Sequence, residues 1–353
     1  MEKRNDLLLY KIIVAVCVAF IFVTVLSTTD FGNILKGKKN KTNDSYNVMA
    51  ETIDTNIVDN SIMSEISEIT KGCLIINLPS GVREINTSVS RDLMNKKILV
   101  EFPMGITDYD FSDIQNETTV ISGINHSIKS NIVNIEINLS SVADCVESYE
   151  NNQLILEFFN PSDVDIPVVV IDPGHGGYDV GAIEKGVYEK DIDLEICKLL
   201  KQFLDSENIL VYYTRLEDDY PTVEERVNFV NEVMPDLFIS IHSNWYEDYS
   251  VSGTSVLYNV NDNSEFSSAW LSNILCEEIV EGCETYNKGI IDGSEIHIVR
   301  HSKVPVALIE VGFMSNADDF KLLTESAGQI KVAKSIYSGI IRALLQMGKY
   351  KVY

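Results

Sequence analysis

The C-terminal half of the chain alternates short apolar runs with amphipathic segments, and this alternation restricts the fold more than any other feature. Three runs, at 168–172, 236–242 and 304–310, are almost continuously apolar up to their last residues, which is typical of strands buried on both faces of a parallel sheet. Segments between them, such as 193–206, carry apolar residues at helical spacing. We therefore predict an α/β domain over residues 167–348, with a mostly parallel twisted sheet covered by helices on both faces.

The preceding region, residues 71–161, has a different pattern and is expected to form a domain of its own. Runs such as CLIINLP, KKILVEFP and NIVNIEINL alternate apolar and polar residues and are separated by turn residues. A period of two without a long amphipathic segment indicates a small all-β domain, either one antiparallel sheet or a sandwich. The polar residues 29–70 are predicted to form a linker.

The first 28 residues contain a long apolar stretch, LLLYKIIVAVCVAFIFVTVLS. Its length matches the roughly 20 residues that a membrane-spanning helix needs, and only Lys11 interrupts it. No small-residue cleavage motif closes the stretch, so we predict an uncleaved membrane anchor over 1–28 rather than a signal segment; cleavage would make the protein secreted. Basic residues flank both sides, so the charge bias does not fix the orientation.

Charge and cysteine spacing exclude some partners. The chain has 53 acidic and 28 basic residues, so it does not attract the phosphates of nucleic acid. Its six cysteines form no C-x-x-C pair, which argues against a cysteine-ligated metal. A bridge between Cys73 and Cys145 and a set of free thiols both fit the spacing, and we favour free thiols.

Three predicted strands end in side chains that bind metals or transfer protons. His175 follows VVVIDPG, His242 ends DLFISIH and Glu310 ends VPVALIE. Because sites gather beyond the carboxyl ends of parallel strands, we expect these three side chains to lie together. Glu189, at the start of a predicted helix, is a fourth candidate, although it could equally serve to complement the helix dipole.

Two histidines and a carboxylate form the ligand set of a hydrolytic zinc site with one position open for water. A second carboxylate is then needed to take the proton of that water and return it to the leaving group. Glycines on both sides of His175 would let the backbone turn sharply and let a substrate come close. A phosphate-binding loop does not fit, since no Lys-Ser or Lys-Thr pair follows these glycines.

These motifs resemble those of the type-3 family of zinc-dependent N-acetylmuramoyl-L-alanine amidases, which cut bacterial peptidoglycan. The matching stretches cover nearly all of residues 167–348 in the family's order: IDPGHGGYDVGA, EKDIDLEI, VYYTR, VEERVNFVN, DLFISIHSN, GTSVLYN and ALIEVGFMSN. The resemblance implies that His175, Glu189 and His242 bind one Zn²⁺. It also implies that Glu310 is the catalytic glutamate and that peptidoglycan is the substrate.

The sequence departs from the family's pattern in two places. The family's Asn-Arg-Gly stretch is replaced by YNKGI, with Lys288 in place of arginine, and lysine cannot form arginine's bidentate pair. No long additional helix of the kind that plugs the site in some members is expected between His242 and Glu310. The β-rich region 71–161 is weakly similar, in architecture alone, to the AMIN-type domains that bind the wall.

Residues next to the motifs have predicted supporting roles. Asp172 is expected to orient the glycine loop, and Arg226 to pair with an acid. Asn244 is expected either to contact the substrate or to hold His242 in place.

Two further residues near the motifs have open interpretations. His297 is predicted to lie on a strand at 294–299, as a histidine of the core or of the rim. Trp245 is expected either to form an apolar wall of the groove or to pack in the ordinary way.

The sequence thus predicts a cell-wall hydrolase that cleaves the amide bond between N-acetylmuramic acid and L-alanine. The alternative is a non-catalytic, membrane-anchored wall-binding protein with a degenerate amidase domain. In either case we expect a single membrane span with the catalytic domain outside the cytoplasm. The sequence does not define the oligomeric state.

Overall fold

The computed structural model describes residues 71–105 and 109–351 of the chain. The anchor predicted at 1–28 and the linker predicted at 29–70 lie outside these residues. Among the residues described, none of the helices combines the length and the apolar character needed to cross a membrane.

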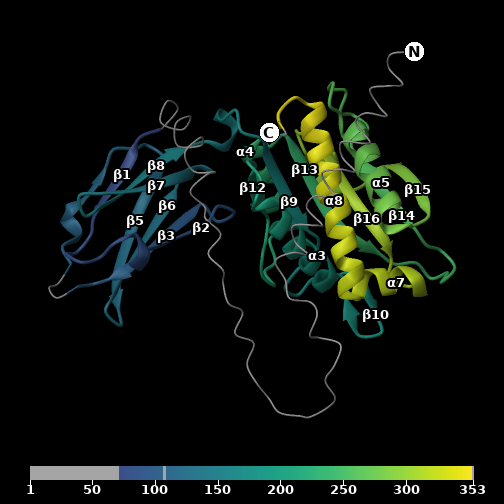
Figure 1. Ribbon diagram of the computed structural model, residues 1–353, viewed down its shortest axis with the longest axis horizontal. Coiled ribbons are helices and arrows are strands. Elements are labelled where there is room, and N and C mark those ends of the chain that lie inside the picture. Colours follow the sequence, from purple (N-terminus) through teal and green to yellow (C-terminus); the bar gives the residue numbers. More distant parts are fainter. Residues whose placement is uncertain (1–70, 106–108, 352–353) are drawn as a thin grey trace, which may run out of the picture. The chain divides into compact units, whose positions relative to one another are not determined.

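The β-rich region consists of two four-stranded antiparallel sheets (Figure 1). Its strands are β1 (Cys73–Asn77), β2 (Ser88–Asp92), β3 (Lys97–Pro103), β4 (Ile114–Asn116), β5 (Ile121–Lys129), β6 (Ile132–Leu139), β7 (Asp144–Glu150) and β8 (Gln153–Phe159). Three short 3₁₀ turns accompany them: η2 (Glu84–Asn86), η3 (Phe111–Asp113) and η4 (Pro161–Asp163). The sheet orders are β4-β1-β8-β7 and β2-β3-β6-β5. Every second residue of β3 and β6 is buried in one apolar core, so the period of two marks the face that packs inward.

The thiols of this region are free. Neither Cys73 nor Cys145 forms a disulfide, and the other cysteines among the described residues are also unbridged. The prediction of free thiols is confirmed for these residues, while Cys17 lies outside them.

The second region is built on a six-stranded sheet of order β12-β9-β13-β16-β14-β15. Its strands are β9 (Val168–Pro173), β12 (Leu210–Tyr213), β13 (Leu237–Asn244), β14 (Thr254–Tyr258), β15 (Asn287–Asp292) and β16 (Val306–Phe313), with a separate hairpin of β10 (Ile183–Glu184) and β11 (Val187–Tyr188). Strands β12, β9, β13 and β16 run parallel. All six residues of β9 are buried, as its continuous apolar run predicts.

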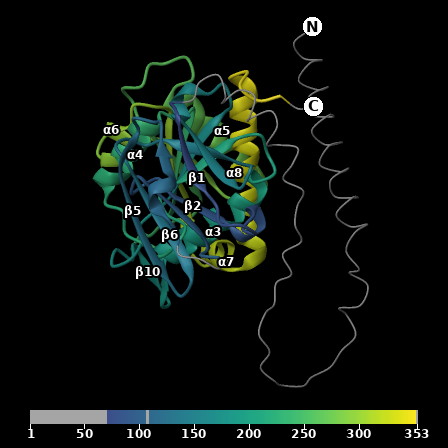
Figure 2. The same ribbon diagram turned by 90° about the vertical axis from the view of Figure 1, so that its left-hand side faces the viewer.

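Helices cover both faces of this sheet, which confirms the predicted α/β fold. They are α3 (Glu189–Leu204), α4 (Val223–Val233), α5 (Ser268–Cys283), α6 (His297–His301), α7 (Ala317–Thr324) and α8 (Ser326–Gln346). Helices α3, α5 and α8 pack on one face in one apolar core, and residues of α4 and α6 belong to the core on the other face. Figure 1 shows α8, in yellow, running along β9, β13 and β16, and Figure 2 shows α4 and α6 on the side away from α8.

Two details differ from the predicted pattern. Strand β14 pairs antiparallel with β16, so β14 and β15 run opposite to the other four strands. The strand predicted at 294–299 is wrong, because His297–His301 forms the short helix α6. Ile298 and Val299 are both buried; burial of adjacent residues suits a helix turn against the sheet, whereas a strand facing solvent on one side buries alternate ones.

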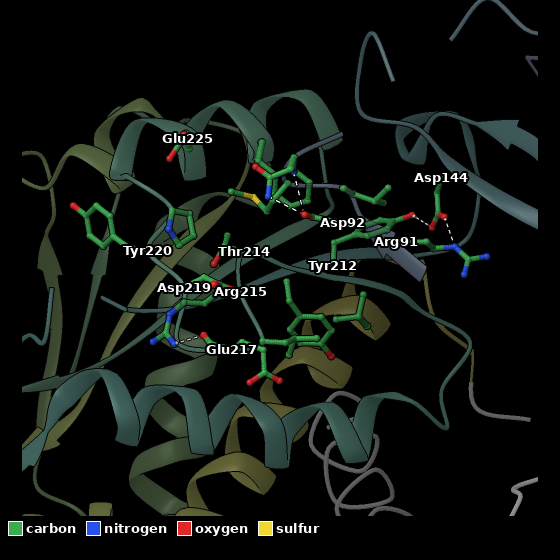
Figure 3. Close-up of a pocket in the computed structure, with 18 residues that line it drawn as sticks. Arg91, Asp92, Asp144, Tyr212, Thr214, Arg215, Glu217, Asp219, Tyr220 and Glu225 are labelled. Carbon is green, nitrogen blue, oxygen red and sulfur yellow. Dashed lines mark hydrogen bonds and ion pairs between the residues drawn. The ribbon is translucent and has the colours of Figure 1, made fainter. Parts of the chain in front are cut away.

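Residues of both regions also line a cavity of about 660 Å³ (Figure 3). In this cavity the Tyr212 hydroxyl donates a 3.0 Å hydrogen bond to Asp144, whose other carboxylate oxygen accepts one from Arg91 at 3.0 Å. Lys96 of the β-rich region forms a 2.7 Å ion pair with Glu232, in the last turn of α4.

Candidate active site

The sheet brings the predicted strand-end residues to one edge. Strand β9 ends at Pro173, which lies opposite Ile241 of β13, so His175 leaves the sheet next to His242. On the other side of β13, Glu310 of β16 is the register partner of His242. The three side chains line one cavity of about 500 Å³. Parallel pairing therefore brings together residues that are far apart in the chain, as predicted for His175, His242 and Glu310.

Glycines in the loop after β9 let the two imidazoles approach. A Cβ on Gly174 would lie 2.3 Å from Cε1 of His242, so any larger residue would displace that ring. A Cβ on Gly181 would lie 2.6 Å from Oε2 of Glu189, and the φ of Gly181 is +64°. His175 itself has a φ of +58°, a left-handed backbone conformation that residues other than glycine rarely adopt.

Glu189 lies between the two histidines, at the first position of α3. Its Oε1 is 3.1 Å from Nε2 of His175 and 3.1 Å from Nδ1 of His242. Its Oε2 accepts a 2.8 Å hydrogen bond from the backbone N–H of Ala182, which fixes the carboxylate. One ligand atom from each of these three residues lies within 4.8 Å of the others. Glu189 is thus more than a charge at a helix N-terminus.

The pKa values of Glu189 and His175 reflect how close the charged groups of the site lie. Burial opposes ionisation of Glu189, but hydrogen bonds and charge from His175 and His242 outweigh it and hold its pKa below the ordinary value. Burial also opposes the charged form of His175, whereas Glu189 and Asp179 raise its pKa on balance. The His175 Nδ1 lies 3.0 Å from Asp179, as an ion pair outside hydrogen-bond geometry.

These three residues fit a zinc ion. Two imidazole nitrogens and a carboxylate oxygen are the donors of hydrolytic zinc sites, and at bond lengths of about 2 Å they stand roughly 3.3 Å apart in a tetrahedral arrangement. The 3.1 Å separations around Glu189 are close to that spacing. A cation bound between the three side chains would take the place of the direct contacts between the Glu189 carboxylate and the two imidazoles.

Glu310 faces the same cavity in a different state. Its Oε2 is buried and has no hydrogen-bond partner. Burial raises its pKa to about 7, with the charge of Glu189 adding to that rise and His242 and His175 opposing it. A buried carboxylate with a raised pKa and one oxygen without a hydrogen-bond partner suits proton transfer.

A buried ion pair holds the glycine loop from behind. Asp172 is 1 % exposed and accepts hydrogen bonds from Thr214 and Ser240, both at 2.6 Å, and from Arg226. Arg226 also donates to the carbonyl oxygens of Pro173 and His175. The predicted roles of Asp172 and Arg226 agree with these contacts.

Two other residues that hold the loop by hydrogen bonds, Arg215 and Lys190, were not predicted from the sequence. Arg215 is buried and donates to the carbonyl oxygens of Pro173, Gly174 and Lys190. Lys190 binds the carbonyl oxygen of Gly177 at 2.8 Å and pairs with Asp218. Arg215 stands two residues after β12 and Lys190 directly after Glu189, so their position relative to the motifs was the only available signal.

The remaining candidates lie around the cavity. Asn244, Trp245 and His297 all line it. The Asn244 Oδ1 accepts the backbone N–H of Trp245 at 2.8 Å, and the Trp245 indole donates to Glu184 at 3.2 Å, which fixes the ring as a wall of the cavity. His297 is an exposed rim residue.

Lys288 and helix α5 both lie outside the lining of this cavity. The Lys288 Nζ lies 5.3 Å from the centre of the Phe313 ring. Helix α5, which stands between His242 and Glu310 in the chain, packs against α8 and the sheet.

Comparison with known proteins agrees with this geometry. Residues 169–342 match the family described as N-acetylmuramoyl-L-alanine amidase. The germination-specific N-acetylmuramoyl-L-alanine amidase of Bacillus subtilis is 30 % identical over 197 residues, which cover 51 % of this chain and 81 % of the relative. The chain belongs to the N-acetylmuramoyl-L-alanine amidase family.

Two further similarities each cover about half of this chain. The N-acetylmuramoyl-L-alanine amidase LytC of Bacillus subtilis is 30 % identical over 173 residues, which make up 49 % of this amidase-family chain and 34 % of LytC. This chain therefore spans about a third of the length of that relative. A crystal structure of an N-acetylmuramoyl-L-alanine amidase from Clostridium difficile 630 is 28 % identical, with a TM-score of 0.49, and covers 52 % of this chain and 98 % of the other.

Proposed function

We propose that the chain is a zinc-dependent amidase that hydrolyses the bond between the lactyl group of N-acetylmuramic acid and L-alanine in peptidoglycan. The observation that carries this proposal is the convergence of His175, Glu189 and His242 within 4.8 Å. Glu310 lines the same cavity, so a proton-transferring carboxylate accompanies the ligand set. Membership of the amidase family names the bond.

The proposed chemistry divides the work between a metal and the chain. A zinc ion held by His175, Glu189 and His242 would polarise the amide carbonyl and lower the pKa of a water molecule. Glu310 takes the proton of the attacking water and passes it to the nitrogen of the departing L-alanine. Its Oε2 has no hydrogen-bond partner, which leaves that oxygen free for both steps.

The surrounding residues keep the reacting groups in position. Arg226 and Arg215 hold the carbonyl oxygens of the loop that carries His175. Three of these four bonds are buried, and together they would keep His175 in its left-handed conformation while a substrate enters and leaves. Trp245, held by Glu184, gives the cavity one apolar wall against the substrate.

The test is hydrolysis of purified peptidoglycan by the full chain, followed as new amino groups of L-alanine. We expect wild-type protein to release peptide, a chelator to stop the release, and added zinc to restore it. Glu310→Gln should keep one zinc per chain and lose turnover, whereas Glu281→Gln, exposed on α5, should match wild type. Binding to the wall without any release by wild-type protein would contradict the proposal and favour a non-catalytic wall-binding protein.

We also propose a location that brings the enzyme to its substrate. The apolar stretch within residues 1–28 would hold the chain at the membrane, with the amidase domain outside the cytoplasm. The β-rich region would bind the wall, as AMIN-type domains do. Fractionation of cells that express the full chain tests the first point, and a pull-down of the full chain with and without residues 71–161 on insoluble wall tests the second.

A further inference from the structure

Two tyrosines, Tyr178 and the half-buried Tyr220, form an aromatic pair beside the cavity of about 500 Å³ that holds His175, Glu189 and His242, here called the zinc-site cavity. Tyr178 follows His175 by three residues and is 80 % exposed. Its ring centre lies 4.2 Å from that of Tyr220, with an angle of 42° between the ring planes. Tyr220 lines both the zinc-site cavity and the cavity of about 660 Å³, and Figure 3 shows its ring pointing away from Arg215.

The backbone beneath this pair is fastened. The N–H of Gly177 donates to Asp218 at 2.8 Å, and its carbonyl oxygen accepts from Lys190 at 2.8 Å. A Cβ on Gly177 would lie 3.0 Å from the Cβ of Tyr220, so the loop and this tyrosine are in direct contact. A rigid aromatic surface of this kind binds a ligand with little loss of side-chain entropy.

The proposed reaction places a sugar near these rings, and the inference rests on that proposed function. The scissile amide joins the lactyl group of a muramic acid, so the glycan strand must pass close to the ligands when the bond is cut. One face of a pyranose ring consists largely of C–H groups, and an aromatic ring can bury that face.

The charge at the rim near the aromatic pair suits an uncharged ligand. Asp179 follows Tyr178 directly in the chain and lines the cavity, as does Glu295. Neither belongs to the proposed ligand set, and the one arginine among the lining residues, Arg226, is buried and already paired. At this rim an uncharged sugar ring is therefore disfavoured less than a group that carries a carboxylate.

We propose that Tyr178 and Tyr220 form a glycan subsite, which stacks on a pyranose ring of the peptidoglycan strand next to the reacting muramic acid. The subsite makes the enzyme prefer polymeric glycan over a small muramoyl peptide. Tyr178 supplies the exposed face, and Tyr220 links that face to the cavity.

The test measures binding of short, peptide-free glycan strands to zinc-loaded full-length protein that carries Glu310→Gln. Adding Tyr178→Ala should weaken binding about three- to tenfold, the range expected for one lost aromatic contact. Tyr178→Phe, which keeps the ring, should bind like the parent. Tyr286→Ala is the matched control, because this tyrosine is 70 % exposed and lines neither cavity.

Activity gives a second readout in the background with Glu310 intact. The ratio of kcat/KM for polymeric peptidoglycan to that for a small muramoyl peptide should fall about three- to tenfold in Tyr178→Ala and stay constant in Tyr286→Ala. Unchanged glycan affinity in Tyr178→Ala overturns the subsite, as does an equal loss in Tyr286→Ala or a loss of affinity for free stem peptide alone. Failure of the wild-type chain to release any peptide sinks the proposed function, while the glycan-binding result still decides the subsite.

Discussion

The buried ion pair between Arg226 and Asp172 supports the site. Its burial and its hydrogen bonds set the free energy of unfolding that is lost when the pair is broken. The two side chains are 4 % and 1 % exposed, and the guanidinium also binds the carbonyl oxygens of Pro173 and His175. Replacing Arg226 by methionine fills a similar volume but leaves a buried carboxylate with only the two hydroxyl donors Thr214 and Ser240.

The expected loss is about 3–5 kcal/mol of the free energy of unfolding, as for other buried pairs that lose one partner. For a domain of this size the melting temperature should fall by roughly 6–20 °C. The loop should also hold His175 less well, so zinc affinity should fall about 10- to 100-fold, as it does when groups that orient a ligand are removed.

The pH dependence of this loss identifies its cause. In the wild type, burial raises the pKa of Asp172, but Arg226 and the hydroxyl groups outweigh burial and lower it on balance. Because of this lowered pKa, ionised Asp172 stabilises the folded protein at pH values above its ordinary pKa. This stabilisation is lost as the pH falls through the pKa of Asp172 in the folded protein. Without Arg226, burial prevails and the folded pKa rises, so the deficit of Arg226→Met should shrink as pH is lowered from 7 towards 4.

The assay is urea unfolding of Arg226→Met and wild type at several pH values, combined with a zinc titration. Arg342→Met is the matched control, because Arg342 pairs with Glu277 and Glu278 while 30 % exposed, and its loss should cost no more than about 1 kcal/mol. A deficit below about 1 kcal/mol for Arg226→Met, or one that does not change with pH, would refute the reasoning.

Three further outcomes follow from the site. Gly174→Ala should lose most of its zinc and turnover, because the new Cβ would lie 2.3 Å from the His242 ring; metal analysis and turnover of the purified variant check this. The kcat/KM should fall on the acid side as Glu310 is protonated, with a midpoint between its ordinary pKa of 4.5 and the value of about 7 that burial gives it, since the proposed zinc ion would lower the pKa. A flat profile over that range would contradict the role of Glu310. Trp245→Ala should raise KM more than it lowers kcat, because the ring forms a wall of the cavity, and steady-state kinetics separate the two.

Much of the site could be predicted because the relevant signals are local. A run of buried residues precedes both His242 in β13 and Glu310 in β16, and such runs predict strands that pair in parallel. The prediction failed where the local signal was ambiguous. The alternation of Ile296, His297 and Ile298 imitates a strand, whereas the contact of α6 with the sheet selects a helix turn.

The sequence by itself determined the buried parallel strands of the second region and the polar side chains that follow their buried runs, because the run of apolar residues and the period are properties of neighbouring residues. Only the tertiary structure decided that Glu189 meets both histidines, that Glu310 has a buried oxygen without a partner, and that Arg215 holds the glycine loop. These contacts join residues that lie tens of positions apart in the chain. They depend on which strands lie side by side and on how the helices pack on the sheet, and the period of a segment fixes neither.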